Sequence, residues 1–167
     1  NMGDAQGLIS LLNIIDYKIL GDRAKLILIG SGNQFDAIKE KITKEVINCI
    51  ELKRPISFDK YLSLLNVSDI GLVSLDGKLL SNNYPLKMLG YMQQGMPILA
   101  SVNKNNEIIQ TITKNNIGLV SIASDAKQFN ANLDLIISNQ NLRIKQGLNS
   151  LNLFNERYTV SVAVKQI

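Results

Sequence analysis

Residues 70–101 read IGLVSLDGKLLSNNYPLKMLGYMQQGMPILAS, and this stretch decides the fold class. It contains a short apolar run at 70–75, a polar loop, a helical pattern from Pro85 to about Gln94, and a second apolar run at 97–101 that follows Gly95. Short apolar runs that flank a helix are typical of parallel strands whose two faces are both covered. The stretch therefore predicts a strand–helix–strand unit of an α/β protein.

The same alternation continues on both sides of this unit. Further strands are predicted at residues 25–29, 48–52 and 118–122, and further helices at 5–20, 35–47, 57–65, 107–114, 126–138, 141–154 and 160–167. Asp4 is the expected N-cap of the first helix. Five short strands that alternate with helices predict a doubly wound parallel sheet with helices on both faces. We expect one Rossmann-like domain over residues 1–167.

The composition excludes several classes of chemistry. The chain has 167 residues with no His, one Cys, and 18 Lys and Arg against 14 Asp and Glu. Without His there is no Ser-His-Asp or Cys-His site and no His-ligated zinc or haem, and we expect neither a metal nor a cofactor. A formal charge of +4 fits an anionic small ligand and is too weak to indicate nucleic acid. Cys49 cannot form an intrachain disulfide, and its apolar setting predicts an inert thiol on a buried strand.

Targeting signals are absent from the sequence as given. It contains no run of about 18 apolar residues and no signal peptide at its start. With the lone cysteine, this favours a cytoplasmic protein, with peripheral attachment to the inner face of the cell membrane left open. The segment 141–154 carries only Arg143 and Lys145 as cations, so a packed surface helix is expected there rather than a membrane anchor. Because Asn1–Asp4 is turn-like and no strand precedes it, we expect a piece of a longer protein.

Ligands of doubly wound sheets bind outside the carboxyl ends of the strands, and three loops at such ends carry suitable residues. The first is Gly30-Ser31-Gly32, between a strand and a helix. Its glycines let the backbone approach a ligand closely, and the following helix offers free N–H groups to an anion. A tight turn that binds no ligand is the alternative.

The second loop runs from Leu80 to Lys87. Pro85 suits the first turn of a helix, where its missing N–H costs nothing. The N–H groups of Leu86 and Lys87 would then point outward at the positive end of the helix dipole, and Lys87 adds a cation suited to a diphosphate. A Pro-started helix with a solvated lysine is the alternative. Tyr84 could stack on a ligand or only fix the start of the helix.

The third loop is the opening segment Asn1–Gly7, which would follow a missing first strand. Gly3, Asp4 and Gln6 could contact a sugar or a phosphate there. An ordinary capped loop accounts for the same spacing.

A dinucleotide site is a rival interpretation. Gly30-Ser31-Gly32 begins an imperfect G-x-G-x-x-G pattern, and Glu51 follows about 20 residues later, where such folds place the acid that binds ribose. The third glycine, which lets helix and strand pack closely, is replaced by Phe35. A nicotinamide- or flavin-binding domain therefore stays open.

Three segments resemble a known family. Residues 27–32 are similar to its apolar strand and G-x-G turn, 69–72 to its "aDi.l.PS" strand, and 84–101 to its "P.K.lEymacG.PVias" signature. Over its full length the chain resembles the C-terminal donor-binding domain of GT-B glycosyltransferases of the family-4 type, the glycosyl transferases group 1. The resemblance implies a Rossmann-like half of a GT-B architecture that binds a nucleotide-sugar.

The functional positions of the family match only in part. Its two Glu, separated by seven residues, fall on Asn82 and Gly90, and the Arg and Lys near the start of the domain fall on Asn1 and Gln6. None of these four residues is charged. The chain also resembles a subgroup with similar NMGDAQGL and NYPLKMLGYM segments, which transfers N-acetylated amino sugars, N-acetylfucosamine among them, in bacterial surface-polysaccharide assembly.

Under this resemblance Asn82 and Asn83 would hydrogen-bond sugar hydroxyls or the N-acetyl group, although both can also be loop-forming amides. Lys87 would be the catalytic residue, because it would neutralise the departing diphosphate. The full set of expected donor-binding residues is Gly3, Asp4, Gln6, Gly30, Ser31, Gly32, Asn82, Asn83, Tyr84, Pro85, Leu86, Lys87 and Gly90.

The resemblance implies retaining transfer from a UDP-linked N-acetylamino sugar to a lipid-linked oligosaccharide in O-antigen or capsule synthesis. An N-terminal domain of the longer chain would hold the acceptor, so we expect these 167 residues to bind the donor weakly and to transfer nothing. Half of a nucleotide-sugar epimerase, an NAD-type oxidoreductase module and a non-catalytic α/β interaction domain are the alternatives.

Overall fold

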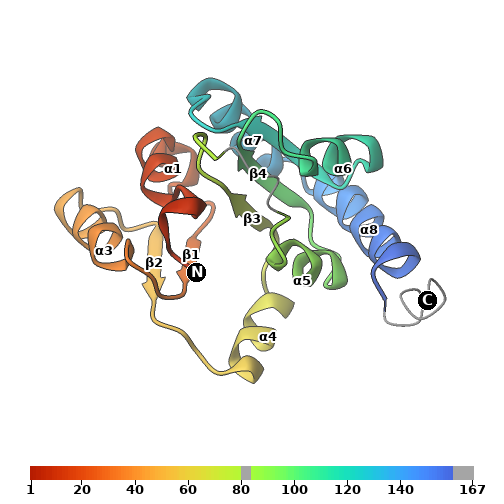
Figure 1. Ribbon diagram of the computed structural model, residues 1–167, viewed down its shortest axis with the longest axis horizontal. Coiled ribbons are helices and arrows are strands. Elements are labelled where there is room, and N and C mark those ends of the chain that lie inside the picture. Colours follow the sequence, from red (N-terminus) through yellow and green to blue (C-terminus); the bar gives the residue numbers. More distant parts are fainter. Residues whose placement is uncertain (80–83, 160–167) are drawn as a thin grey trace.

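The computed structural model of the chain describes residues 1–79 and 84–159. Asn82, Asn83 and the helix predicted at 160–167 lie outside the described residues. Figure 1 shows the strands in the middle of the molecule with helices around them. The strands are β1 (Leu26–Ile29), β2 (Ile50–Lys53), β3 (Gly71–Ser74), β4 (Ile98–Val102) and β5 (Gly118–Ile122). All five lie where the apolar runs predicted them, and all pairs are parallel.

The strands form two sheets instead of the predicted single one. One sheet has the order β1-β2 and the other the order β3-β4-β5, with no ladder between β1 and β3 in the described part of the chain. At the carboxyl ends the N-terminal segment lies between β1 and β3. The Met2 N–H donates to the Ser31 carbonyl (2.8 Å), and the Asp76 N–H donates to the Ala5 carbonyl (3.0 Å). Because the ends of β1 and β3 bond to this segment, they do not bond to each other.

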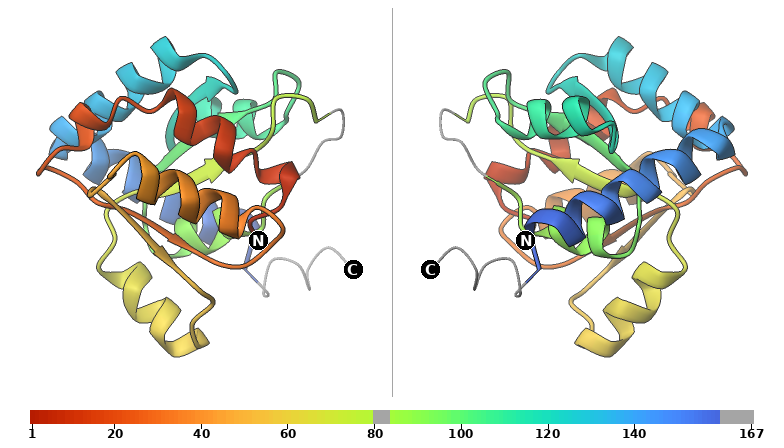
Figure 2. Two further views of the ribbon diagram at one scale, coloured as in Figure 1. Left: turned by 90° about the vertical axis from the view of Figure 1, so that its left-hand side faces the viewer. Right: turned by 90° about the vertical axis from the view of Figure 1, so that its right-hand side faces the viewer.

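The helices cover both faces, as the doubly wound prediction requires. They are the 3₁₀ turn η1 (Asp4–Gln6), α1 (Leu8–Ile14), α2 (Tyr17–Leu20), α3 (Phe35–Lys44), α4 (Phe58–Asn66), α5 (Lys87–Gln93), α6 (Ile108–Asn115), α7 (Ala126–Ser138) and α8 (Gln140–Arg157). In Figures 1 and 2, α5, α6 and α8 lie together on one side of the larger sheet, and α7 lies on the other side with α1 and α2 against it.

The buried side chains of β4 show how the two faces divide the core. All five residues of this central strand are buried. Leu99 packs with Phe129, Leu133 and Ile136 of α7, whereas Ile98 and its alternate neighbours pack with Met88, Met92, Ile108 and Ile112 of α5 and α6. The period-2 alternation of a strand sends successive side chains into opposite layers, so β4 is the centre of the fold.

The helix predicted at 5–20 is wrong as a single element. The chain forms η1, α1 and α2 because Gly7 has a left-handed φ of +55° and an extended turn follows Ile14. Asp4 lies inside η1 and is not the N-cap of α1, which is Gly7. Asp16 caps α2 instead, with its Oδ1 accepting the Lys18 N–H at 3.1 Å. The left-handed turn at Gly7 and the Asp16 cap therefore divide what the apolar spacing predicts as one continuous helix.

Other predicted boundaries need smaller corrections. The helix predicted at 35–47 ends at Lys44, since Val46 turns to φ +52° and is 71% exposed while Ile47 is buried. Cys49 lies in the turn before β2 and is half-buried, not on a buried strand. Burial still raises the pKa of its thiol, which agrees with an unreactive group. The helix predicted from Pro85 starts at Lys87.

Candidate functional site

The N-terminal loop, residues 1–7, lies directly against the glycine turn, residues 30–32. Besides the Met2–Ser31 bond, the Gln34 N–H donates to the Met2 carbonyl at 3.0 Å. A Cβ on Gly32 would stand 2.6 Å from both the carbonyl carbon and the oxygen of Met2. Gly32 is thus required by close backbone packing, and the structure brings together two of the three loops predicted to bind a ligand.

The side chains of the N-terminal loop are used largely to hold it in place. The Asp4 carboxylate accepts from Asn33 Nδ2 (2.9 Å) and from Gln34 Nε2 (2.8 Å). Gln6 Oε1 accepts the Gly3 N–H at 3.0 Å. Asp4, Gly3 and Gln6 therefore make internal contacts, and a direct role for them toward a ligand stays a prediction. Ser31 and Gly32 of the adjoining glycine turn are exposed residues.

A row of serines crosses the larger sheet at its carboxyl end, and the sequence reasoning missed it. Ser74, Ser101 and Ser121 are in register on β3, β4 and β5, and all three are buried. Ser74 Oγ donates to the Gln6 carbonyl at 2.7 Å, which ties β3 to the N-terminal loop. The signal was present, because the runs LVS, LAS and LVS each place a serine near the end of a strand.

A polar hollow of about 280 Å³ opens beside this row. Ser74 and Ser101 line it together with Asp76, Lys78 and Ser124, which follow the strands, and with Ser10 of α1. The Asp76 carboxylate accepts the Lys78 N–H at 2.7 Å and shapes this segment. Hydroxyls, a carboxylate and an ammonium group around one hollow suit a polyhydroxylated or phosphorylated molecule.

The start of α5 carries the predicted phosphate-binding group. Pro85 is buried, its carbonyl accepts the Met88 N–H at 2.9 Å, and Leu86 is 77% exposed. Among the described residues, no acceptor is bonded to the N–H groups of Leu86 and Lys87. Their availability to a phosphate stays a prediction.

Lys87 is the most unusual cation near these loops. Its side chain is half-buried, and burial lowers the pKa of its ammonium group. None of the described carboxylates forms an ion pair with it. A desolvated ammonium group without a counter-ion gains more from an incoming anion than a solvated lysine does.

Tyr84 and Gly90, the other described candidates near α5, make contacts within the fold. The Tyr84 hydroxyl lies 3.0 Å from the Tyr158 hydroxyl, and the two ring centroids are 6.3 Å apart. Burial, and to a smaller extent this hydrogen bond, raise the pKa of Tyr84. A Cβ on Gly90 would lie 3.7 Å from the Tyr61 hydroxyl. In the described residues, no hydrogen bond or ion pair joins Tyr84, Pro85, Leu86 or Lys87 to the N-terminal loop.

The geometry around Glu51 does not favour the dinucleotide interpretation. Glu51 lies inside β2, opposite Ile27, instead of at the carboxyl end of a strand. Its carboxylate pairs with Lys53 (2.9 Å) and Lys25 (3.7 Å), and the hydrogen bond from Lys53 contributes most to lowering its pKa. Phe35, at the position of the third glycine, is buried against the Arg54 guanidinium, which lies 4.2 Å from the ring centroid. The Glu51 carboxylate thus forms ion pairs with the neighbouring lysines.

The described residues contain neither a cluster of metal ligands nor a helix that could span a membrane. Within 1–79 and 84–159, no three His, Cys, Asp or Glu side chains gather in a way that could hold a metal ion. Over the same part of the chain, no helix is both long and apolar enough to cross a membrane.

Comparison with known proteins gives a family match by sequence. The family described as "Glycosyl transferases group 1" matches residues 4–151. This range includes most of the N-terminal loop, the glycine turn and the start of α5. A search of the curated proteins finds no match to this sequence.

Solved structures match the fold closely at low sequence identity. WaaG, a glycosyltransferase involved in lipopolysaccharide biosynthesis, gives a TM-score of 0.71 at 17% identity over 97% of this chain and 42% of its own. A TarM variant from S. aureus gives a TM-score of 0.78 at 15% identity, over 97% of this chain and 32% of its own. That structure is a complex with fondaparinux, α-GlcNAc-glycerol and UDP. The catalytic domain of the cholesterol α-glucosyltransferase from Helicobacter pylori gives a TM-score of 0.69 at 17% identity, over 91% of this chain and 88% of its own. The chain therefore spans less than half of the WaaG and TarM chains.

Proposed function

The chain belongs to the glycosyl transferases group 1 family, and from this membership we propose that residues 1–167 are the nucleotide-sugar-binding domain of a glycosyltransferase. The donor is a UDP-linked N-acetylamino sugar, and the acceptor is a lipid-linked oligosaccharide of a bacterial surface polysaccharide. A further domain of the longer protein holds the acceptor. Because this domain supplies only the donor half of the active site, we expect it to bind the donor weakly and to transfer nothing alone.

The observation that carries the proposal is the state of Lys87. It is a half-buried cation with a lowered pKa and no ion-pair partner among the described residues, at the first position of α5. The N–H groups of Leu86 and Lys87, which bond to no acceptor in 1–79 or 84–159, lie beside it. Cationic and N–H donors at one point suit the two phosphates of a nucleotide-sugar.

The chemistry asked of these groups is stabilisation of negative charge. When the bond between the sugar and the diphosphate breaks, charge accumulates on the departing phosphate oxygens. N–H donors and an ammonium group that are already in place stabilise this charge without the reorganisation that water would need. No step on this half of the site requires an imidazole. The glycine turn and the N-terminal loop would bind the remainder of the donor through backbone groups.

The choice of UDP and of an amino sugar rests on separate support. The TarM structure, similar to this fold, is a complex with UDP. The NMGDAQGL and NYPLKMLGYM segments resemble those of transferases for N-acetylated amino sugars. Asn82 and Asn83 would then bond to the N-acetyl group or the sugar hydroxyls, in place of the carboxylate that the family usually has at the first of these positions.

Calorimetric titration tests the proposal. We expect UDP and UDP-N-acetylglucosamine to bind and NAD to give no heat. Replacing Lys87 by Met should weaken UDP binding at least about tenfold, the loss of one charge-assisted contact of about 1.5 kcal/mol. The matched control is Lys127→Met, which removes an exposed lysine of α7 and should leave the affinity unchanged. Binding of NAD without UDP would instead support an oxidoreductase module.

The uncharged family positions motivate one competing function, a non-catalytic interaction domain. Asn1, Gln6, Asn82 and Gly90 stand where the family usually carries charges. Such a domain would bind neither UDP nor a UDP-sugar, with Lys87 or without it. Absence of UDP binding to both the unchanged chain and Lys87→Met would favour this function, whereas UDP binding that Lys87→Met leaves unchanged would contradict a donor site built on Lys87.

The protonated Lys87 side chain should also lower the stability of the fold, and this gives a second prediction. Its lowered pKa means that the unfolded chain binds the proton more tightly than the folded chain. Below its lowered pKa the protonated side chain therefore destabilises the fold, and the cost fades as the pH rises through that pKa toward the unfolded value near 10.4. We expect Lys87→Met to raise the Tm by about 2–4 °C at pH 7, as a gain of about 1 kcal/mol would.

Thermal melts at pH 7 and pH 9.5 measure this effect. The gain in Tm should be smaller at pH 9.5, and Lys127→Met should show no gain at either pH. A lower Tm for Lys87→Met would mean that the ammonium group stabilises the fold, and Lys87 would then be a structural residue.

A further inference from the structure

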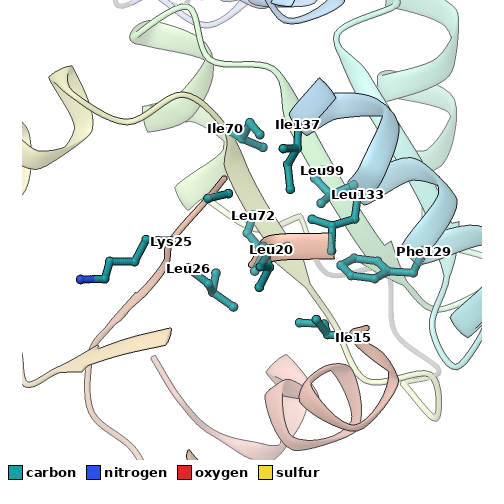
Figure 3. A pocket seen from close by; sticks show the side chains of 11 residues that line it. Ile15, Leu20, Lys25, Leu26, Ile70, Leu72, Leu99, Phe129, Leu133 and Ile137 are labelled. Atoms are coloured by element: carbon teal, nitrogen blue, oxygen red, sulfur yellow. The ribbon is translucent and has the colours of Figure 1, made fainter. Parts of the chain in front are cut away.

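The face of the larger sheet that α1 and α7 cover changes from apolar to polar toward its carboxyl end. Figure 3 shows Leu72 of β3 and Leu99 of β4 among the side chains that line an apolar pocket together with Phe129 of α7. Two positions further along the same strands stand Ser74 and Ser101. Because side chains two positions apart in a strand lie on the same face, both serines continue this layer. Apolar packing therefore gives way to hydroxyl groups beside the polar hollow.

The Ser101 hydroxyl differs from the other two of the serine row, because it has no partner among the described residues. Ser74 Oγ donates to the Gln6 carbonyl at 2.7 Å, and Ser121 Oγ donates to the Ala100 carbonyl at 3.3 Å. Ser101 is only 2% exposed, and its hydroxyl forms no hydrogen bond within 1–79 and 84–159. Burial of a hydroxyl without a partner is unfavourable. Since Ser101 lines the polar hollow, a ligand there would supply the missing hydrogen bond.

The carboxylate and the ammonium group at the hollow balance each other in charge. Asp76 Oδ1 accepts the Lys78 N–H at 2.7 Å, and the other carboxylate oxygen accepts no hydrogen bond from the described residues. In the same part of the chain, neither side chain forms an ion pair. A phosphate in the hollow would lie near this carboxylate and be repelled by it. A neutral ligand with hydroxyl groups suits it, because an ionised carboxylate only accepts hydrogen bonds.

Apolar side chains complete the lining. Leu11 and Ile14 of α1 and Leu75 after β3 line the hollow beside the hydroxyl groups. A sugar ring carries C–H groups as well as hydroxyls, so it matches a lining of both kinds, whereas a phosphate has no apolar face. The volume of about 280 Å³ lies at the lower end for small-molecule pockets, which span about 300–1,000 Å³. The hollow therefore suits one sugar ring and is too small for a nucleotide.

The polar hollow and Lys87 belong to opposite faces of the larger sheet. Lys87 begins α5, which packs with Ile98 and Ala100 of β4 on one face. Ser101 follows these residues on the other face, which α1 and α7 cover. Figures 1 and 2 show α5 and α1 on the two sides of this sheet. A ligand in the hollow would thus leave the groups of the proposed donor site unoccupied.

We propose that the polar hollow binds one neutral monosaccharide unit, at a site separate from the proposed donor site. Ser101 Oγ and the Asp76 carboxylate bond to hydroxyl groups of the sugar, and the Lys78 ammonium group donates to a further oxygen. Leu11 and Leu75 contact its C–H groups. The site does not depend on whether the start of α5 binds a diphosphate.

Two-dimensional amide spectra of the 167-residue chain, titrated with glucose and with N-acetylglucosamine, test the proposal. We expect one or both sugars to give saturable shifts at the amides of Asp76, Ser101 and Ser124. Ser101→Ala should weaken this binding at least about fivefold, as loss of one hydrogen bond would. Its Tm should stay the same or rise, because no hydrogen bond within the described residues is lost.

A control and a second variant keep the test independent of changes in folding. Ser121→Ala removes another buried hydroxyl of the serine row, one that does not line the hollow, and should leave the sugar affinity unchanged. Asp76→Asn retains an acceptor for the Lys78 N–H and removes the negative charge. It should weaken sugar binding about fivefold while the Tm changes little.

The other outcomes contradict the proposal. Absence of saturation with both sugars would overturn it, as would equal sugar affinity in Ser101→Ala and the unchanged chain. Saturable shifts confined to the amides of Leu86 and Lys87 would place the sugar at the start of α5 and overturn it too. Inorganic phosphate that shifts the hollow amides where the sugars do not would assign the hollow to an anion. Sugar binding that Ser101→Ala and Asp76→Asn weaken and Ser121→Ala does not supports the proposal, whether or not UDP binds.

Discussion

Replacing Gly147 by alanine is expected to lower the free energy of unfolding by about 2 kcal/mol. Gly147 is buried on α8, where a Cβ would collide with the Gly95 carbonyl oxygen and come within 3.3 Å of its carbon. That carbonyl belongs to the turn that ends α5, which is held at a φ of +65° on Gly95. Overpacking of this kind costs about 3 kcal/mol, whereas alanine gains only about 1 kcal/mol in helix propensity. The net effect on the free energy of unfolding is therefore a loss.

Gly90→Ala is the matched control for this prediction. Gly90 also lies inside a helix, α5, but its added Cβ would meet only the Tyr61 hydroxyl at 3.7 Å, an ordinary contact. The same substitution should therefore stabilise the chain by about 0.5–1 kcal/mol. Urea unfolding followed by circular dichroism measures both. Equal and small effects at the two positions would contradict the close approach of α8 to the α5–β4 turn.

The sequence predicted the parts of the fold that depend on local pattern. All five strands were found because each is a short apolar run, and α7 was predicted at its observed bounds, Ala126–Ser138, with Asp125 accepting the Gln128 N–H as its cap. The break at Gly7 was missed because it depends on distant packing. A Cβ there would lie 2.8 Å from the Cα of Asp76, a residue far along the chain. The separation of the sheets was missed for the same reason, since strand pairing is a long-range property.

The sequence predicted two loops that the structure brings together, but not the contacts that their side chains make within the fold. The rule that ligands bind at the carboxyl ends of strands selected the N-terminal loop and the glycine turn, which do lie together. It could not show that Asp4 is held by Asn33 and Gln34, because those bonds join residues about 30 positions apart. Tyr84 was considered for stacking on a ligand, and only the fold shows that Tyr158 of the C-terminal region engages its hydroxyl.

Gly32→Ala is expected to have the largest effect on the candidate site. Gly32 has a φ of +153°, which alanine adopts only with strain, and its Cβ would lie 2.6 Å from the carbonyl group of Met2. The N-terminal loop would have to move, and the Met2–Ser31 and Gln34–Met2 hydrogen bonds would be lost. We expect a loss of about 3 kcal/mol from strain and collision together. If the proposed donor site is correct, UDP affinity should fall by more than about tenfold, because both loops shift.

Gly30→Ala separates strain from collision. Gly30 has nearly the same φ, +155°, but its Cβ would make only ordinary contacts, with the Met2 side chain at 3.5 Å and the Asn1 backbone nitrogen at 3.6 Å. This variant should lose about 1–2 kcal/mol, the cost of the backbone strain alone. Two-dimensional amide spectra should then show displaced resonances for Met2–Gln6 in Gly32→Ala and not in Gly30→Ala. Equal losses of stability and identical spectra would mean that φ alone requires glycine at both positions. The N-terminal loop would then not be held by the close approach of Gly32 to Met2, and the donor site would have to be built without it.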